Sequence, residues 1–246
     1  MNDETELKAL VEEAYSLFSS YPMGTNIAVC HEFICCLASD DAEILKTRPI
    51  QDVDRRLIYE YLDAGEGEDP IALAIQTKHL LPKILELFVQ GEHIRHSNEC
   101  IFGKCRFHLD VWKPDEIEFM QRFTLCYFQK QLMIFKEIDS VDQFIIMFHT
   151  AGLNIQPLLA YWESVLDQAM PMLNLIQMLH YDFEDNHYDQ AFADDKLIQI
   201  MNQWLRNLRT NKILINALVD VVSKNNIPAK YAYMYDSAFD QLKILN

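Results

Sequence analysis

The sequence contains few residues that form turns, with six glycines and eight prolines among 246 residues. An all-β sandwich or barrel needs a turn about every 8–12 residues, and most nucleotide-binding turns need closely spaced glycines. The composition argues against both. The chain also has no Gly-rich phosphate loop, no Gly-x-Ser-x-Gly nucleophile elbow, no His-Glu-x-x-His and no kinase signature. We therefore expect a protein that is not an enzyme of these kinds.

Long apolar runs are absent as well. No stretch of about 18 apolar residues occurs, as a transmembrane helix would require. The first six residues, Met1 to Glu6, are acidic and have neither the basic nor the apolar region of a signal peptide. We expect a cytoplasmic protein that does not enter the membrane. Because cysteines are kept reduced in that compartment, no disulfide framework is expected.

Positive charge is scarce, with 21 Lys and Arg against 37 Asp and Glu and a formal net charge of −16. The acidic residues are concentrated in residues 1–70. Such a surface repels phosphate backbones and anionic lipids, so neither a nucleic acid nor a membrane is expected as a partner. It attracts a basic protein partner, although acidic residues also serve solubility alone.

Half of the residues are hydrophobic, which is the proportion of a folded globular protein. Apolar residues recur at three- and four-residue steps along most of the chain, as between Ile117 and Phe128, and this spacing is typical of amphipathic helices. About ten helices with short connections predict an all-α fold, either a multi-helix bundle or an irregular helical array. We expect a single domain over residues 1–246, with the irregular region 91–113 as the place where it would subdivide.

Capping residues and prolines mark the expected helix ends. Ser39 predicts the start of a short helix over 40–47, and Asp52 predicts the start of the next helix. Pro70 opens a helix that reaches about residue 90, in which Pro82 is expected to bend or split the helix. The last two helices are expected over 195–224 and 228–244.

The six cysteines fall mostly into two groups. Cys30 and Cys35 enclose four residues, as do Cys100 and Cys105, and both pairs lie in irregular stretches. Four thiolates bind Zn²⁺ tetrahedrally, so the sequence offers a zinc site made of Cys30, Cys35, Cys100 and Cys105. The alternative is that these cysteines are reduced, buried and act only as small apolar side chains.

The segment from His180 to Asp189 is dense in carboxylates and imidazoles, which are ligands of divalent cations. Its spacing fits neither an EF-hand nor the paired Glu-x-x-His motif of di-iron bundles. We interpret it first as a solvated acidic loop, with a metal-dependent enzyme site as the alternative. We interpret His79, close to Pro82, as a structural histidine at a helix kink.

Five short motifs follow one another over residues 20–220: Cys35-Cys36-Leu37-Ala38-Ser39, Arg48-Pro49-Ile50, His79-Leu80-Leu81-Pro82-Lys83-Ile84-Leu85-Glu86-Leu87, the stretch from Ala151-Gly152-Leu153-Asn154 to Tyr161-Trp162, and Trp204-Leu205-Arg206. In this order they resemble an uncharacterised family of bacterial, all-helical, cytoplasmic proteins. The resemblance implies a soluble helical protein and transfers no catalytic residue. The family has a more compact Cys-Pro-Cys-Cys-like segment where this chain reads Cys-His-Glu-Phe-Ile-Cys-Cys, so no cysteine role is transferred either.

The leading hypothesis for the function is a protein-binding role in the bacterial cytoplasm. An acidic inhibitor fits, such as an immunity protein or antitoxin-like factor that masks a basic toxin. The second hypothesis is a zinc-stabilised structural or scaffold domain built on the four cysteines. The third is a metal-dependent enzyme acting at residues 180–189.

Overall fold

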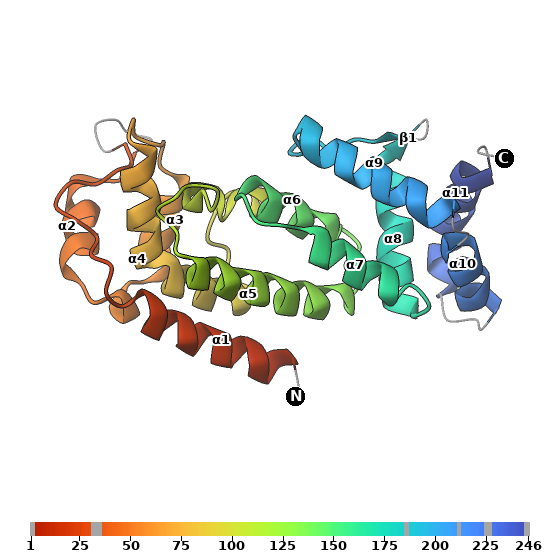
Figure 1. Ribbon diagram of the computed structural model, residues 1–246, viewed down its shortest axis with the longest axis horizontal. Helices are drawn as coiled ribbons and strands as arrows, with labels where there is room; N and C mark the ends of the chain where they lie inside the picture. The colour runs from red at the N-terminus through yellow and green to blue at the C-terminus, as the bar shows by residue number, and fades with distance from the viewer. Residues whose placement is uncertain (1–2, 31–35, 185–186, 211–212, 224–227, 244–246) are drawn as a thin grey trace. The chain divides into compact units, whose positions relative to one another are not determined.

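The computed structural model describes residues 3–30, 36–184, 187–210, 213–223 and 228–243, and over these ranges the fold is all-α, as predicted (Figure 1). The chain divides into two compact units. Unit 1 comprises Met1–Tyr127 with Thr150–Leu153, and unit 2 comprises Phe128–His149 with Asn154–Asn246. The region 91–113, the expected place of a subdivision, lies within unit 1.

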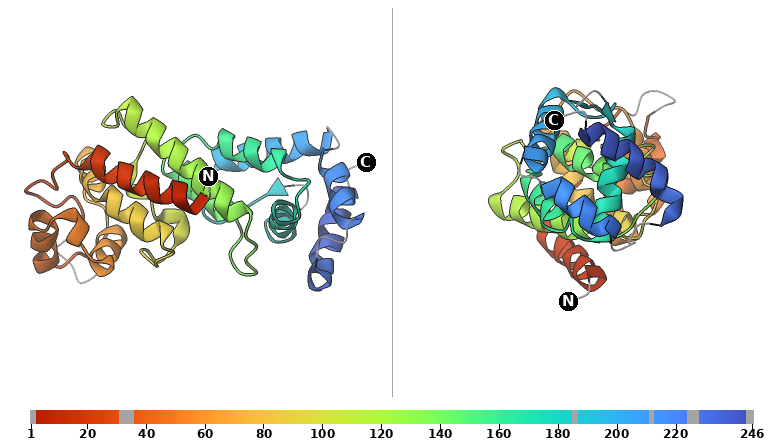
Figure 2. Two further views of the ribbon diagram at one scale, coloured as in Figure 1. Left: turned by 90° about the horizontal axis from the view of Figure 1, so that it is seen from below. Right: turned by 90° about the vertical axis from the view of Figure 1, so that its right-hand side faces the viewer.

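Unit 1 is built around one long helix, α4 (Pro70–Val89), along which α1 (Asp3–Phe18) packs (Figure 2). Its remaining elements are α2 (Ser39–Thr47), η1 (Ile50–Asp52), α3 (Arg55–Asp63), η2 (Asn98–Cys100), η3 (Gly103–Cys105) and the part of α5 (Pro114–Leu132) up to residue 127. Two of the three 3₁₀ turns, η2 and η3, lie in the stretch 91–113, which is irregular as expected.

The core of unit 1 is rich in aromatic side chains. Phe18, at the end of α1, is buried and meets the ring edges of Trp112 and Phe119 at centroid distances of 6.2 and 5.8 Å. Edge-to-face contacts of this kind add to the free energy gained by burying apolar area. They fix α1 and α5 against the irregular segment that precedes α5.

A buried ion pair joins α4 to α5. Lys78 Nζ lies 2.5 Å from Glu116 Oε2, and both side chains are about 1% exposed. Lys78 also donates to the Val111 carbonyl at 2.6 Å, while the Tyr21 hydroxyl donates to Glu116 Oε1. The rings of Tyr21 and Trp112 lie 4.4 and 4.7 Å from the ammonium. Each charge therefore has several polar partners, which burial requires.

Two expected helix caps differ from the observed ones. Ser39 is the first residue of α2, and the capping position is Ala38, whose side chain offers no oxygen. Asp54, and not Asp52, caps α3 by accepting from the Leu57 amide at 2.9 Å, because Asp52 belongs to the short η1 turn. Sequence marks the neighbourhood of a helix end more reliably than the capping residue itself.

Pro82 lies inside α4, which is nevertheless assigned as one helix over its whole length. Of the two expected effects of Pro82, the split is wrong, and the bend stays a prediction. Thirteen residues of α4 are buried, so tertiary packing holds the helix together despite the missing backbone hydrogen bond.

Unit 2 contains the end of α5, then α6 (Asp142–Thr150) up to its last residue, α7 (Gln156–Ser164), α8 (Ala169–Tyr181), β1 (Phe183–Glu184), β2 (His187–Tyr188), α9 (Asp195–Thr210), α10 (Ile213–Ser223), η4 (Ala229–Tyr231) and α11 (Ala232–Lys243). The helix expected over 195–224 is described as two helices, α9 and α10, and the residues between them lie outside the described ranges. α8 packs against α10 and α11.

Buried amides of α8 bind the last residue of α5 and the chain that follows it. Asn174 donates to the carbonyls of Leu132 and Ile134 at 2.9 and 3.1 Å. Gln177 donates to those of Lys136 and Glu137 at 2.9 and 3.2 Å. The last carbonyl of a helix and the carbonyls of a loop have no partner within a regular element, and these two side chains satisfy four of them.

Among the helices that the structure describes, none combines the length and the apolar character that crossing a lipid bilayer demands.

Candidate functional site

A groove of about 600 Å³ lies in unit 1 between two segments that are far apart in the sequence. Residues 26–30 form one side, and the loop 66–69 with the first turn of α4 forms the other. Its lining carries three carboxylates, those of Glu66, Glu68 and Asp69. We call it the acidic groove.

The two sides are joined as a short antiparallel ladder. Val29 pairs with Glu66, the Cys30 amide donates to the Gly65 carbonyl at 2.8 Å, and the Gly67 amide donates to the Ala28 carbonyl at 2.9 Å. A Cβ at residue 67 would lie 2.4 Å from the Ala28 carbonyl oxygen. Only glycine permits this approach, so Gly67 is required by the ladder.

The side chain of Gln76, on α4, makes hydrogen bonds to the backbone of residues 26 and 28. Its side-chain oxygen accepts from the Ala28 amide at 2.8 Å, and its side-chain nitrogen donates to the Asn26 carbonyl. The residue is only 4% exposed. A single buried amide therefore replaces two hydrogen bonds that a neighbouring strand would otherwise make, and it holds residues 26–28 against α4.

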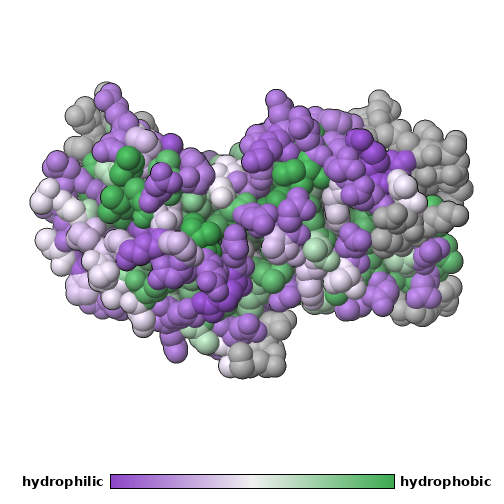
Figure 3. Space-filling view, viewed as in Figure 1, coloured by the Kyte–Doolittle hydropathy of each residue, from purple (hydrophilic) through white to green (hydrophobic). Residues whose placement is uncertain are grey.

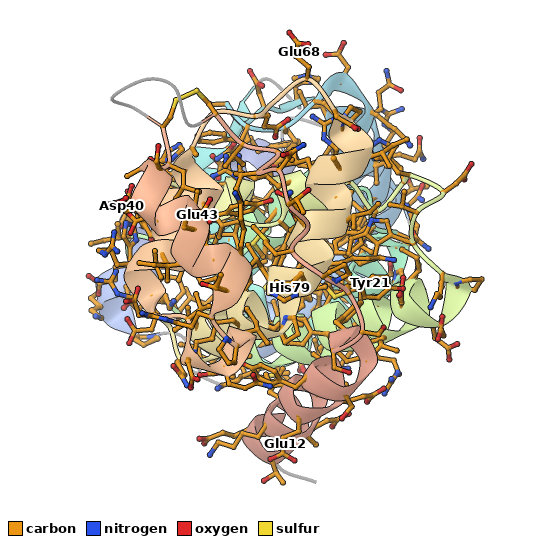
Figure 4. All side chains as sticks on the ribbon, turned by 90° about the vertical axis from the view of Figure 1, so that its left-hand side faces the viewer. Glu12, Tyr21, Asp40, Glu43, Glu68 and His79 are labelled. Atoms are coloured by element: carbon orange, nitrogen blue, oxygen red, sulfur yellow. A yellow bond between two sulfur atoms is a disulfide. The ribbon has the colours of Figure 1, made fainter. Side chains whose placement is uncertain are left out.

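The three carboxylates are in different situations. Glu66 is paired with the guanidinium of Arg106. Asp69 caps α4, accepting from the amides of Ile71 and Ala72 at 2.9 and 3.0 Å. Glu68 lies between them at the exposed end of the loop before α4, where Figure 4 shows it directed away from the ribbon. Glu68 is thus the carboxylate best placed to meet an incoming cation.

Apolar side chains accompany the acidic ones. Ile27 and Val29 line the groove from one side, and Ala72 lines it from the other. On the first two turns of α4, Ile71 and Ile75 are 52% and 36% exposed. Figure 3 shows apolar residues at the surface over this end of α4. The site therefore offers both charge and apolar contact, the combination found in protein interfaces.

Lys104 lies behind the loop of the groove. Its side chain is fully buried, and Nζ donates to the Ala64 carbonyl at 2.6 Å. Burial, and after it the charge of the neighbouring Arg95, lower the pKa of Lys104 to about 8, because both disfavour the charged ammonium. The hydrogen bond fixes residue 64 directly before the strand that carries Glu66.

The structure describes three of the four cysteines of the predicted zinc site, Cys30, Cys100 and Cys105. Cys30 forms a disulfide with Cys36, contrary to the expectation of reduced cysteines, and Cys35 lies outside the described residues. Cys100 is half-buried. Cys105 is fully buried, and this burial raises the pKa of its thiol. A sulfur held in a disulfide cannot bind zinc as a thiolate, so the predicted site would require the reduced protein.

Cys30 and the residue beside Cys105 both contact residues 64–65. The Cys30 amide bonds the carbonyl of Gly65, and Lys104, next to Cys105, bonds that of Ala64. Within the described part of the chain, no three side chains of His, Cys, Asp or Glu gather closely enough to hold a metal ion. The zinc site stays a prediction.

The segment His180 to Asp189 is described except for residues 185 and 186. Within it, β1 pairs with β2 in antiparallel fashion, two residues on each side. Tyr188 is buried and donates from its hydroxyl to Asp142 at 2.7 Å. Burial raises the pKa of Asp182 to about 7, with the charge of Asp142 as a second cause. The described residues thus show a structural carboxylate cluster, and a metal-dependent activity at this segment stays a prediction.

His79, interpreted from the sequence as a structural histidine at a helix kink, contacts the segment that follows α1. Its Nδ1 lies 2.6 Å from the Tyr21 carbonyl oxygen, and Figure 4 shows the two residues side by side. The contact ties the chain after α1 to the middle of α4.

Sequence reasoning missed the acidic groove. The loop 64–70 was recognisable from its glycines and acidic residues, but nothing in the pattern of residues 26–30 indicates that they pair with it. One signal was present in the sequence: Gly67 lies between two glutamates, and a glycine there can indicate a close approach of another backbone segment.

Searches against protein-family models, curated proteins and solved structures found no match to this chain.

Proposed function

We propose that the protein binds a basic segment of another protein in the acidic groove and thereby masks it, as an immunity protein or antitoxin masks a toxin. The observation that carries the proposal is a groove of about 600 Å³ whose lining holds three carboxylates, next to the exposed Ile71 and Ile75 on the first two turns of α4. A groove of this size accommodates a few side chains of a partner.

The electrostatics favour a cationic occupant. The groove holds three carboxylates, of which Glu66 is paired with Arg106, while the Lys104 ammonium lies buried behind the loop. The whole chain has a formal net charge of −16. Charge of one sign on a protein attracts and orients a partner of the opposite sign, and the attraction falls as salt screens it. The exposed isoleucines of α4 would contact the aliphatic stems of Lys or Arg, which cover apolar surface readily.

The test uses a labelled ten-residue peptide of alternating Lys and Ala, with an alternating Glu and Ala peptide for comparison. Fluorescence anisotropy measures the affinity of the full chain for each peptide at about 50 and 300 mM salt. We expect the Lys peptide to bind, the Glu peptide not to bind, and the affinity to fall at least about tenfold at the higher salt.

Two charge-reversal variants locate the site. Glu68→Lys should weaken binding of the Lys peptide about tenfold or more, because it places a cation at the mouth of the groove. Glu12→Lys is the matched control, since Glu12 is exposed on α1 and changes the net charge equally. Equal losses for the two variants would mean that only the overall charge attracts the peptide, and the groove would then have no role.

Affinity capture from the source cells at low salt then identifies the partner. The captured protein should be basic, should be recovered by the wild-type chain and by Glu12→Lys, and should be lost with Glu68→Lys. Recovery of mainly acidic proteins by the wild-type chain would contradict the proposal.

A further inference from the structure

The Cys30–Cys36 disulfide, drawn as a yellow bond in Figure 4, lies at one wall of the acidic groove. Cys30 lines the groove, and its backbone belongs to the ladder, in which its amide donates to the Gly65 carbonyl at 2.8 Å. Its carbonyl accepts from the Leu37 amide at 3.0 Å. The disulfide therefore joins the end of residues 26–30 covalently to the residue directly before Leu37.

The other end of this covalent link is attached to packed structure. Leu37 is 1% exposed and directly precedes the capping position of α2. α2 is in turn bound to α3, because Asp41 accepts two hydrogen bonds from the Arg56 guanidinium, at 2.7 and 2.8 Å. The disulfide thus holds residues 26–30 against a part of unit 1 that does not belong to the groove.

The ladder itself is held by few interactions. Among the residues that the structure describes, two backbone hydrogen bonds cross it, and the Gln76 side chain adds two more. Two short paired strands are marginally stable in water, and one hydrogen bond shifts the equilibrium between the closed and the open ladder only about 2- to 12-fold.

The disulfide has a larger effect on that equilibrium than any one of these hydrogen bonds. It closes a loop across a sequence separation of six residues, which limits the conformations available to the open ladder. A constraint of this size favours the closed ladder about 30-fold. Breaking the disulfide therefore changes how often the groove is intact.

The disulfide is also accessible to small reagents. Cys30 and Cys36 are both partly exposed, whereas Cys105 and Cys126 are buried. Burial raises the pKa of the Cys105 thiol, so Cys105 supplies little thiolate to compete in an exchange reaction. Thiol–disulfide exchange requires a thiolate to reach one of the two sulfur atoms, and partial exposure permits this attack.

We propose that the Cys30–Cys36 disulfide is a redox switch of the acidic groove, which keeps the ladder closed when oxidised and releases residues 26–30 when reduced. The inference rests on the function proposed for the groove, since the property under control is its affinity for a basic segment. The oxidised chain is the form that binds.

The reductant is a low-molecular-weight thiol. Its thiolate attacks one sulfur of the pair, which forms a mixed disulfide and releases the other cysteine as a thiolate that takes up a proton. A second reagent thiolate then attacks the reagent sulfur of the mixed disulfide and releases the remaining cysteine. The protein gains two electrons and two protons and ends with two thiols, while two reagent thiols become one disulfide. The oxidised reagent reverses both steps.

The first test measures the ladder directly and needs no ligand. Hydrogen exchange of the Cys30 and Gly67 amides, followed by NMR in the full chain, should become at least about tenfold faster after reduction with glutathione. The Tyr188 amide of unit 2, which donates to Asn202 Oδ1 at 2.8 Å, should exchange at an unchanged rate. Unchanged exchange at Cys30 and Gly67 would overturn the proposal, as would a disulfide that excess reduced glutathione does not break.

The second test measures the affinity for the Lys peptide by fluorescence anisotropy. Reduction should weaken binding at least about fivefold, because a smaller fraction of the molecules has the groove intact. Reciprocity then requires the bound peptide to protect the disulfide by the same factor. The squared concentration of reduced glutathione, divided by that of oxidised glutathione, should therefore rise by this factor at half reduction when the peptide is saturating.

Cysteine variants assign the response to this disulfide. All measurements use the Cys35→Ser background, so that no third thiol adjoins Cys36 in the sequence. Cys30→Ser combined with Cys36→Ser should behave as the reduced chain, with and without glutathione. Cys100→Ser is the matched control, because it removes a half-buried thiol and leaves the disulfide intact, and it should keep the full response.

The two tests distinguish failure of this inference from failure of the proposed function. Faster exchange at the ladder on reduction, with no binding of the Lys peptide by either form, would refute the function proposed for the groove and would still support the switch in the ladder. Equal affinity of the oxidised and reduced chains for the Lys peptide would overturn the control of the groove by the disulfide.

Discussion

The buried ion pair between Lys78 and Glu116 predicts a specific pattern of stabilities. Replacing Lys78 with Met removes the cation but leaves the Glu116 carboxylate 1% exposed. Among the described residues, the Tyr21 hydroxyl and the Lys113 amide remain as its donors. Removing one partner of a buried ion pair costs about 3–5 kcal/mol. The two remaining donors favour the lower end, so we expect a loss of about 3 kcal/mol in the free energy of unfolding.

The complementary variant, Glu116→Leu, leaves the ammonium of Lys78 without its anion. The Val111 carbonyl and the two aromatic rings at 4.4 and 4.7 Å remain as partners. These contacts are weaker than a carboxylate for a desolvated ammonium, so the expected loss is about 3–4 kcal/mol. Removing both charges leaves neither ion uncompensated, and the double variant should lose only about 1–2 kcal/mol.

Urea unfolding followed by circular dichroism measures all four members of this cycle under one condition. The expected coupling between the two residues is about 4–6 kcal/mol, obtained from the single losses and the double loss. Losses below about 1 kcal/mol for both single variants would show that water reaches the pair. A double variant that loses as much as the two single variants together would show that the residues act independently, and the reasoning would be wrong.

Three further predictions concern the two units separately. Asp182→Asn should stabilise the protein by about 1–3 kcal/mol at pH 8 and have little effect at pH 4. A carboxyl whose pKa is raised to about 7 favours the folded state when protonated, and this contribution to stability is lost as pH rises from about 4 to 7. Urea unfolding at both pH values measures the effect, and equal effects at the two pH values would contradict the prediction. Gly67→Ala should cost about 1–3 kcal/mol of stability and abolish binding of the Lys peptide, because its Cβ would lie 2.4 Å from the Ala28 carbonyl oxygen. Gly65→Ala, whose Cβ would lie 3.6 Å from the nearest atom, should be tolerated, and thermal unfolding and fluorescence anisotropy of both variants measure the difference. Reducing the Cys30–Cys36 disulfide should lower the free energy of unfolding by about 2 kcal/mol through loop entropy alone, as measured by unfolding with and without reductant. Elemental analysis of the reduced protein then tests the predicted zinc site, and about one zinc per chain is the result that supports it.

The class of fold could be predicted from the sequence because the pattern that indicates a helix involves residues close together in the chain. Apolar residues at three- and four-residue steps determine which face of a segment is buried, and α5, from Pro114 to Leu132, follows this pattern closely. Prolines at helix starts were equally informative, as Pro70 shows. The errors occurred where local signals compete: Asp52 and Asp54 are both good caps, and Pro82 disfavours a helix that the buried face of α4 maintains.

The acidic groove could not be predicted for a different reason. Its ladder joins residues 28–30 to 65–67, and the amide that supports it comes from Gln76, so each partner is distant in sequence and lacks a recognisable motif. The two cysteine groups show the same limitation, because their spacing suggested one site, whereas Cys30 pairs with Cys36 within its own group.

The sequence by itself determined the helical periodicity, the excess of negative charge and the absence of familiar catalytic motifs, since each is a property of composition or of residues close together in the chain. Tertiary structure alone decided that Glu68 stands beside apolar residues of a groove, that Lys78 meets Glu116, and that the Trp204 indole is buried without an acceptor among the described residues. Those arrangements depend on contacts between segments brought together by folding, where desolvation sets the strength of each charge and each hydrogen bond.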